Sequence, residues 1–277
     1  MKIAFLYHTH EVSKELVRNI RSLSNQGHYV FLLVNDANGR KEAYYELSTS
    51  PTVHVEQEVE FANSGDLSLP RYYLLMMRKG LENPNIKYFV TIHPHMAPLK
   101  TNTYIEEFLT KHYPSNFYKV FEQPIDAKYI QRYFPYTNIK SFATSKFTQN
   151  WSKATASLLN LVGIRRKPIE KPLVASQYYM ISDQGARDLV ANIEYLLDNF
   201  KLSWFPEQIA IPTMLDKFAT QMHINNNYIL SNQTCPFTIP TVIDFNPMDF
   251  NSEQLFGGPF DYGTIKELLA HYRDQEV

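Results

Sequence analysis

The stretch SWFPEQIAIPTML, residues 203–215, contains the residue types that acid–base chemistry needs. Pro206 suits the first turn of a helix, because its missing N–H would have no intrahelical partner there and its φ is already helical. Glu207 then falls in the first turn, where the helix dipole stabilises negative charge. Two interpretations stay open: Glu207 is a catalytic base, or it is a carboxylate that only stabilises the helix start. Gln208 cannot be the base, because its amide has no titratable acceptor near neutral pH.

Two other groups of residues could do chemistry. His93 and His95 flank a proline and could hold a metal ion from one side. Metal sites in proteins usually need three or four converging ligands, so we predict no metal site and expect loop or acceptor-contact histidines. Cys235 is the only cysteine, which excludes an internal disulfide and allows a reducing compartment. We expect it to be an inert small residue.

The composition restricts the class of partner. The 277 residues carry a net charge of −1, with 44 % hydrophobic and 20 % charged residues. Such a balance does not indicate nucleic acid or an anionic membrane as the partner, so we expect a small molecule or an uncharged polymer. The only tight basic cluster runs from Arg165 to Lys167, and a solvated loop is the favoured interpretation. Aromatic residues reach 14 %, which fits either sugar-stacking surfaces or a compositional bias.

The N-terminus has an apolar run of only five residues before His8, too short for a signal peptide or a membrane span. No later stretch approaches the length of a membrane span. We therefore expect a cytoplasmic protein, with any membrane association peripheral and at the inner face of the membrane.

The first fifty residues predict how candidate residues are positioned. An apolar strand is expected over 3–7, followed by a helix that Ser13 caps and Gly27 ends. A second buried strand is expected over 29–34, followed by the polar turn NDANGR. Strand, helix and strand with short connections predict a parallel α/β sheet.

Polar side chains follow these two strands at their carboxyl ends. His8, Thr9 and His10 follow the first strand, and Asn35 and Asp36 follow the second. Ligands of parallel α/β sheets bind beyond this edge. We therefore expect a ligand site there, with Asp36 contacting a nucleoside.

The alternation of helix and strand continues more loosely along the chain. The expected elements are a helix over about 69–81, a strand over 88–92, a helix opened by a capping box of Thr103 and Glu106, an amphipathic helix over 146–162 around Trp151, Leu158 and Leu161, a strand-like stretch over 174–181, a helix from Ser182 to Leu197, and a final helix over about 264–273. No internal repeat or low-complexity linker interrupts this pattern, so one domain over 1–277 is predicted.

Five segments, in order, carry a resemblance to one family. They are the opening strand with Thr9-His10, where the family usually has Ala-His; YFVTIHPHMAPLKTNTYIEEFL; VASQYYMIS, with Ser176 and Gln177 kept and Tyr178 in the place of a Trp; WFPEQIAIPTML; and PTVIDFNPMDFNSEQLFGGPFD. On these segments the chain resembles the core-2/I-branching β-1,6-N-acetylglucosaminyltransferases, glycosyltransferase family 14. Eukaryotic members are membrane-anchored and rich in disulfides, so the resemblance is to a divergent bacterial-type member.

The resemblance implies a single GT-A type (Rossmann-like) α/β domain with a mostly parallel central sheet. It implies a nucleotide-binding half over about 1–115 and an acceptor and catalytic half over about 116–277. The implied reaction is an inverting transfer of a sugar, N-acetylglucosamine or a related one, from a UDP-sugar to an acceptor hydroxyl. The acceptor would be an oligosaccharide or a lipid-linked glycan. The family needs no metal, and this chain has no D-x-D, so no cofactor is expected.

The chain departs from the family pattern at three places. Aligned on Thr213 without a gap, the family's catalytic Glu falls on Gln208 and its Asp on Glu207. Glu207 serves as the base only if the helix start is shifted by one residue, because adjacent helical side chains point about 100° apart. The Arg and the Lys that the family uses at the phosphates fall on Asn227 and Pro259.

The resemblance implies the following site residues. We expect donor contacts from Thr9, His10, Asp36, Gly257 and Gly258, acceptor contacts from Ser176, Gln177, Tyr178 and Trp204, and general-base catalysis by Glu207. The alternative is a catalytically inactive relative that binds a glycan or a nucleotide sugar, an interpretation that the departures favour.

Overall fold

The computed structural model describes residues 1–59, 61–122, 126, 128–233, 235–237, 241–243 and 253–275. The strands within these residues are β1 (Lys2–Thr9), β2 (Tyr29–Val34), β3 (Val53–Val55), β4 (Ile86–Ile92), β5 (Ala97–Pro98), β6 (Asn116–Phe117), β7 (Met180–Ser182), β8 (His223–Ile224), β9 (Ile229–Leu230) and β10 (Phe256–Gly257). The helices are α1 (Lys14–Asn25), α2 (Ala37–Leu47), α3 (Ser68–Gly80), α4 (Asn102–His112), α5 (Lys128–Gln131), α6 (Lys146–Leu161), α7 (Asp183–Ala191), α8 (Ile193–Phe200), α9 (Pro206–Phe218) and α10 (Tyr262–Gln275).

A seven-stranded sheet forms the centre of the molecule, in the order β3-β2-β1-β4-β7-β6-β8. The strands β3, β2, β1 and β4 are parallel, β7 is antiparallel to both of its neighbours, and β8 is parallel to β6. The prediction of an α/β fold with a mostly parallel central sheet is confirmed, and the architecture is consistent with a GT-A type domain.

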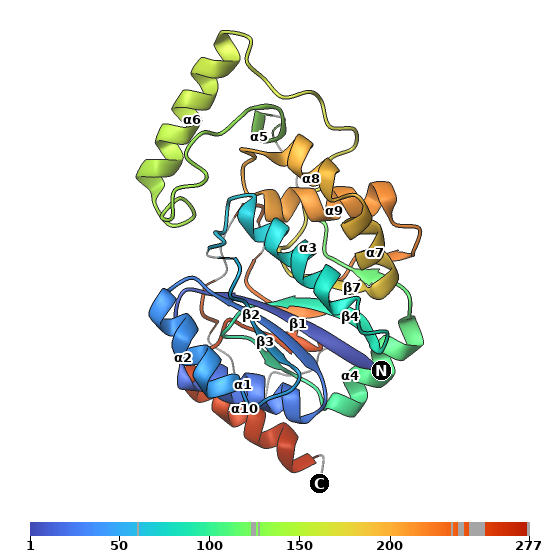
Figure 1. Cartoon of the computed structure of the whole chain (residues 1–277). Coiled ribbons are helices and arrows are strands. Elements are labelled where there is room, and N and C mark those ends of the chain that lie inside the picture. Colours follow the sequence, from blue (N-terminus) through green and yellow to red (C-terminus); the bar gives the residue numbers. More distant parts are fainter. Residues whose placement is uncertain are drawn as a thin grey trace.

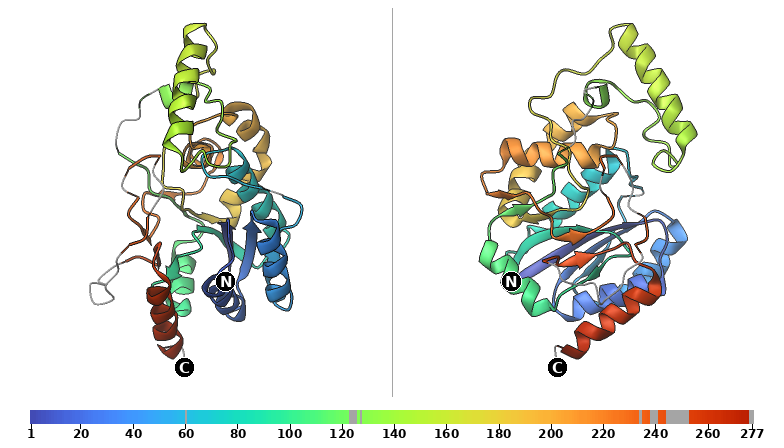
Figure 2. Two further views of the ribbon diagram at one scale, coloured as in Figure 1. Left: turned by 90° about the vertical axis from the view of Figure 1, so that its left-hand side faces the viewer. Right: turned by 180° about the vertical axis from the view of Figure 1, so that it is seen from behind.

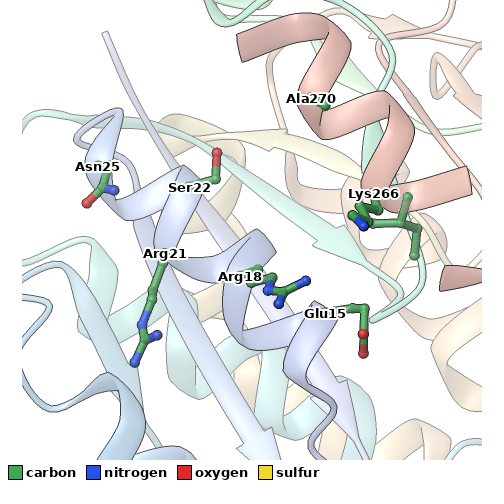
Figure 3. A pocket seen from close by; sticks show the side chains of 8 residues that line it. Glu15, Arg18, Arg21, Ser22, Asn25, Lys266 and Ala270 are labelled. Atoms are coloured by element: carbon green, nitrogen blue, oxygen red, sulfur yellow. The ribbon is translucent and has the colours of Figure 1, made fainter. Parts of the chain in front are cut away.

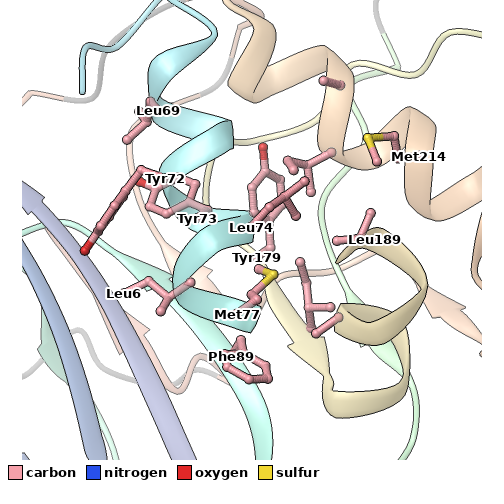
Figure 4. Packing of buried hydrophobic residues seen from close by; sticks show 14 of the residues in the cluster. Leu6, Leu69, Tyr72, Tyr73, Leu74, Met77, Phe89, Tyr179, Leu189 and Met214 are labelled. Carbon is pink, nitrogen blue, oxygen red and sulfur yellow. The ribbon is translucent and has the colours of Figure 1, made fainter. Parts of the chain in front are cut away.

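Helices cover both faces of the sheet (Figures 1 and 2). Ala4 and Leu6 of β1 pack into the hydrophobic cluster that includes residues of α3, α7 and α9. Figure 4 shows side chains of this cluster packed between these elements. Ile3, Phe5 and Tyr7 pack on the opposite face, in the cluster with α1 and α2. Successive residues of a strand point to opposite faces, so a strand covered on both faces must be apolar throughout. This requirement explains the continuous apolar run that opens the sequence.

The local signals near the N-terminus act as the sequence predicts. The Ser13 hydroxyl accepts a hydrogen bond from the Leu16 N–H and so caps α1. Gly27 has a φ of +78°, in the left-handed region where a side chain is disfavoured. The observed strand β2 has the predicted bounds.

Four local predictions are wrong, and one of them is the strand expected over 174–181, of which only Met180 and Ile181 lie in a strand. The stretch NDANGR does not form a turn but begins α2, because the Asp36 carboxylate accepts from the Gly39 N–H and caps a helix there. Thr101, not Thr103, caps α4. The helix expected from Ser182 to Leu197 is divided into α7 and α8 at Asn192.

A second, three-stranded sheet of β5, β10 and β9 lies beside the first, and α10 packs against it. Gly258 has a φ of +134°, and a Cβ added there would lie 2.5 Å from the His95 backbone oxygen. Glycine is therefore required for β10 to approach the segment that follows β4.

An outlying lobe contains α5 and α6, and in Figure 1 α6 stands away from the sheet. An aromatic cluster that includes Phe134, Phe142, Trp204 and Phe205 joins this lobe to the start of α9. Within the described residues, no helix is both long and apolar enough to cross a bilayer.

Candidate active site

The strand order reverses between β1 and β4. From β1 the chain passes to β2 on one side, whereas β4 lies on the other side of β1. Ligands of α/β sheets bind beyond the carboxyl ends of the strands at such a reversal. His8 and Thr9 end β1 and His10 follows it, and His93 and His95 follow β4. The topology therefore gathers histidines from two distant segments at the edge where a ligand is expected.

The loop over 61–67 closes one side of this edge. The Asn35 amide donates to the Ala62 carbonyl at 2.7 Å, and its oxygen accepts from the Ala62 N–H at 3.0 Å. His8 Nε2 lies 2.8 Å from the same carbonyl and 3.1 Å from Asn35 Nδ2. Asn35 thus fixes the loop against the ends of β1 and β2.

The histidines form two pairs. The rings of His8 and His10 lie 5.6 Å apart between centroids, and those of His93 and His95 lie 5.5 Å apart. Burial, together with repulsion from His10, lowers the pKa of His8 to about 4. Burial also lowers the pKa of His93 to about 3, with added repulsion from His95 and His8. His8 and His93 are therefore neutral at pH 7.

His95 connects the site to α1 and α10. Its Nε2 lies 3.1 Å from the Tyr262 hydroxyl, and the two rings lie 4.8 Å apart. Burial lowers the pKa of His95, and the Glu15 carboxylate on α1 opposes that effect. A bound anion would act in the same direction as Glu15 and favour the imidazolium.

Two of the predicted donor residues are engaged in local structure. Asp36 is exposed, and its Oδ2 accepts from the Gly39 N–H at 2.6 Å as the cap of α2. The Thr9 hydroxyl donates to the Glu11 carbonyl at 2.7 Å. Both residues lie at the expected edge, and both already have a structural role there.

The predicted glycines lie at the end of β10, and Gly258 lies next to the His95 backbone. Gly258 donates its N–H to the Leu230 carbonyl at 3.0 Å within the second sheet. At Gly257, a Cβ would lie 2.6 Å from the Leu99 side chain. Close packing accounts for both glycines, and the Gly258 N–H already has an acceptor. Their role in donor binding stays a prediction.

Three of the predicted acceptor residues, Ser176, Gln177 and Tyr178, lie just before β7, the antiparallel strand beside β4. The Thr91 hydroxyl donates to the Gln177 carbonyl at 3.1 Å, which fixes this segment at the carboxyl end of β4. The Ser176 hydroxyl is buried and donates to Gln233 Oε1 at 2.9 Å. The Gln177 amide donates to the Tyr178 hydroxyl at 3.1 Å. These residues thus lie near the reversal point.

Trp204 does not lie with the other three predicted acceptor residues. It is 3 % exposed and packs in the aromatic cluster with Phe134 and Phe142. The Lys153 ammonium covers its ring at 4.9 Å. Trp204 is therefore a core residue that joins the outlying lobe to α9.

Glu207 is fully buried in the first turn of α9. Its Oε1 accepts from the Gly65 N–H at 2.8 Å, whereas its Oε2 has no hydrogen-bond partner among the described residues. Burial raises the pKa of Glu207 from 4.5 to about 8, and Asp66 adds repulsion. A buried carboxyl with one unsatisfied oxygen is unusual outside functional sites.

Gln208 is also fully buried but contacts a different part of the chain. Its side-chain oxygen accepts from the Phe237 N–H at 2.7 Å, and its backbone carbonyl accepts from the Ala175 N–H at 2.9 Å. The helix begins at Pro206, as predicted. Glu207 therefore contacts the loop over 61–67, while Gln208 contacts Phe237.

Two positions of this chain align with the Arg and the Lys that the family uses at the phosphates. They are Asn227 and Pro259, neither of which is charged. The Asn227 side chain is buried and donates to the Tyr178 carbonyl at 3.3 Å. The Pro259 carbonyl accepts from the Ile243 N–H at 2.7 Å. Of the basic cluster that begins at Arg165, Arg166 is buried and donates to two backbone carbonyls, so the expectation of a solvated loop is wrong for this residue. Residues 240 and 244–252 of the predicted closing stretch lie outside the described residues.

The described residues contain no cluster of metal ligands, and the pocket between α1 and α10 lies apart from the predicted site residues. In the described part of the chain, no group of three or more His, Cys, Asp or Glu residues is arranged to hold a metal ion. A pocket of about 460 Å3 lies between α1 and α10, with Glu15, Arg18 and Lys266 among its lining residues (Figure 3). None of the predicted site residues lines this pocket.

Sequence reasoning missed two residues that contact candidate site residues. Gly65 and Gln233 gave no signal, because each acts through a contact across a long stretch of chain, with Glu207 and Ser176 respectively. Such contacts depend on tertiary structure, which no local pattern encodes.

A protein-family model matches most of the chain. Residues 3–202 match the model of the family described as Branch: Core-2/I-Branching enzyme. The match includes the histidines at the sheet edge and the segment of Ser176, and it ends before Glu207. No curated protein matches the chain closely enough to count as a relative.

Proposed function

The chain belongs to the core-2/I-branching enzyme family, and we propose that it transfers a sugar from a UDP-linked donor to a glycan hydroxyl with inversion at the anomeric carbon. Membership makes it a glycosyltransferase of the core-2/I-branching type. The sugar we propose is N-acetylglucosamine or a related one, the acceptor is an oligosaccharide or a lipid-linked glycan, and the reaction needs no metal ion.

Glu207 is the proposed general base, and its unpartnered, buried Oε2 is the observation that carries this proposal. In an inverting transfer the acceptor oxygen attacks the anomeric carbon while the bond to UDP breaks, and the acceptor proton must pass to a base. A pKa near 8 makes the ionised carboxylate a stronger base than an exposed glutamate. Because Glu207 has no exposed surface, a covering segment must move to admit the acceptor, and the loop that holds Gly65 is the candidate.

The donor is proposed to bind at the reversal between β1 and β4. The leaving diphosphate needs positive charge or directed N–H groups, and the family's two cations are replaced by Asn227 and Pro259. His95 is a group at this edge that can supply the charge, because a bound diphosphate would stabilise its imidazolium form. His8 and His93 stay neutral at pH 7.

The reaction can be tested before the acceptor is identified. Many glycosyltransferases slowly release UDP from their donor to water, so UDP release is measured with UDP-N-acetylglucosamine and other UDP-sugars, using GDP-linked sugars as the matched control. A thermal-shift screen with the same compounds reports binding alone, since a ligand at about a hundredfold its dissociation constant adds about 2.7 kcal/mol of stability.

Two outcomes separate the proposal from its alternative. UDP release that Glu207→Gln abolishes supports an enzyme with this base. A thermal shift with UDP-sugars but no release and no transfer to any glycan would support a catalytically inactive relative that binds a nucleotide sugar. The burial of Gln208 at the family's glutamate position is the observation that favours this alternative.

A further inference from the structure

Helix α6 exposes a stripe of apolar side chains. Phe147, Trp151, Leu158 and Leu161 are 73, 56, 64 and 82 % exposed. Together with the exposed Ala154, they follow one another at intervals of four and three residues, which is the spacing of a single helix face. Val162 and Ile164 extend the stripe beyond the helix and are 70 and 50 % exposed.

The opposite face of α6 is the one that packs on the protein. Ser152 and Ala156 are buried, and Ser152 donates to the Pro135 carbonyl. The Gln149 amide donates to the Phe142 carbonyl at 3.0 Å, and Lys153 covers the Trp204 ring. The helix is therefore fixed by its polar and small residues, and most of its large apolar residues are exposed to solvent. Soluble proteins rarely expose a contiguous apolar surface of this kind unless it binds something.

The segment that carries α6 is strongly basic. Residues 128–171 contain nine Lys and Arg and a single carboxylate, Glu170, although the whole chain has a net charge of −1. Exposed cations lie at both ends of the apolar stripe, with Lys146 at its start and Arg165 and Lys167 after its end. The helix itself contains no Asp or Glu.

We propose that the exposed face of α6, from Phe147 to Ile164, is a docking surface for a membrane that contains anionic lipids. An interfacial helix inserts aromatic and aliphatic side chains at the level of the lipid headgroups, and neighbouring Lys and Arg contact the anionic headgroups. A second copy of this chain is a poorer occupant, because two copies docked through α6 would bring two basic segments together.

Packed aromatic side chains connect α6, which carries the docking surface, with the start of α9, where the proposed base lies. The aromatic cluster behind α6 contains Trp204 and Phe205, which immediately precede the first turn of α9 with Glu207. A bilayer bound at α6 would therefore lie on the side of the molecule where α9 begins. This arrangement would bring a lipid-linked acceptor toward the catalytic half, although membrane binding itself does not depend on the enzymatic reaction.

Vesicle flotation tests the proposal with the full chain. The protein should float with vesicles of equal parts phosphatidylcholine and phosphatidylglycerol and stay behind with phosphatidylcholine alone. The double variant Trp151→Gln/Leu158→Gln should lower partitioning by about tenfold or more, from the apolar surface it removes. The triple variant Lys146→Ser/Arg165→Ser/Lys167→Ser should lower it by about a hundredfold at low salt, since each cation near an anionic surface contributes about fivefold.

The two tryptophans provide an independent readout of the bound face. Trp151 is 56 % exposed and Trp204 is 3 % exposed, so iodide quenches chiefly Trp151 in the free protein. Anionic vesicles should shift the emission to shorter wavelength and protect it from iodide. The matched control is Tyr45→Gln/Met222→Gln, which removes side chains that are 82 and 70 % exposed elsewhere on the surface and should float like the wild type.

Several results would overturn the proposal. They are no flotation of the wild type with anionic vesicles, equal flotation with neutral vesicles, or unchanged flotation of both α6 variants. A concentration-dependent dimer in sedimentation velocity that Trp151→Gln/Leu158→Gln abolishes, with no vesicle binding, would show that a second copy occupies this face. All substitutions are at exposed positions, and thermal unfolding verifies that each variant is folded.

Discussion

The carboxylate of Glu207 accepts a hydrogen bond from the backbone N–H of Gly65 at 2.8 Å, across 142 positions of the chain. The same loop bonds through Ala62 to Asn35 and His8 at the edge of the sheet. One short loop therefore contacts both the proposed base and the proposed donor site. The other oxygen of Glu207 has no partner among the described residues. A buried oxygen without a hydrogen bond costs folding free energy, and a functional role would explain why it is kept.

The stability of the protein should depend on pH through Glu207. The pKa of Glu207 is about 8 in the folded protein and 4.5 without the fold, so between these values the folded state binds more protons than the unfolded state. The free energy of unfolding should then fall as the pH rises from about 5 and level off above about 8. Each pKa unit corresponds to about 1.4 kcal/mol, so the loss is on the order of a few kcal/mol.

Urea unfolding at about pH 6 and about pH 9 measures this dependence. Glu207→Gln keeps an oxygen for the Gly65 N–H but cannot titrate, so the difference in unfolding free energy between variant and wild type should grow in favour of the variant as the pH rises. Glu194→Gln, in the exposed first turn of α8, is the matched control and should track the wild type. Parallel curves for Glu207→Gln and wild type would show that Glu207 keeps an ordinary pKa.

The sequence predicts those features that short-range physics controls. The strand β2, the cap at Ser13 and the start of α9 at Pro206 are found as predicted. Alternation, capping and φ preferences act within a few residues, so they can be read locally. The same locality caused the error at NDANGR, where turn-forming residues around Asp36 also make a good helix start.

Tertiary contacts decide what the sequence cannot. The amphipathic pattern around Trp151 predicts α6, but the pattern is the same whether the apolar face meets a core or solvent. The net charge of −1 conceals a basic segment, because acidic residues elsewhere balance it. The pairing of Glu207 with Gly65 has no local signature at all. The roles of the site residues stay predictions, to be tested as follows.

Asp36 should prove to have two separable roles. Asp36→Ala removes both the carboxylate and the cap of α2 and should lower the free energy of unfolding by about 1 kcal/mol. Asp36→Ser keeps a capping oxygen and should leave stability nearly unchanged. If Asp36 also contacts the nucleoside, calorimetric UDP affinity should fall in both variants. Wild-type UDP affinity in Asp36→Ser would remove the carboxylate from the donor site and leave it as a cap.

Transfer activity should persist in excess EDTA. The chain lacks a D-x-D sequence, and the reaction is proposed to neutralise its leaving group with imidazolium groups rather than a divalent cation. Activity is compared before and after chelation and after addition of manganese or magnesium. Complete loss with EDTA that manganese restores would contradict metal independence and would direct attention to His93 and His95 as ligands.

UDP should bind more tightly as the pH falls from about 8 to about 6. Burial lowers the pKa of His95 while Glu15 opposes it, and a bound diphosphate should raise the pKa of His95, so binding takes up protons. Calorimetry in two buffers of different protonation enthalpy measures that uptake. His95→Gln should reduce it, whereas His112→Gln, at the end of α4, should not. Affinity independent of pH would mean that other groups hold the phosphates.

Glu207→Gln should lower turnover by about 10²–10⁴-fold while UDP affinity stays nearly constant, because general-base catalysis contributes about that factor and the amide retains the contact with Gly65. Initial rates of transfer and UDP calorimetry measure the two quantities, with Glu194→Gln as the control.

Gln208→Glu in the Glu207→Gln background restores the family's carboxylate position. It should recover activity only if that position can reach the acceptor, and the 2.7 Å contact of Gln208 with the Phe237 N–H argues that it will not. Recovery would assign the base to position 208, and wild-type turnover in Glu207→Gln would leave Glu207 as a residue of the helix start.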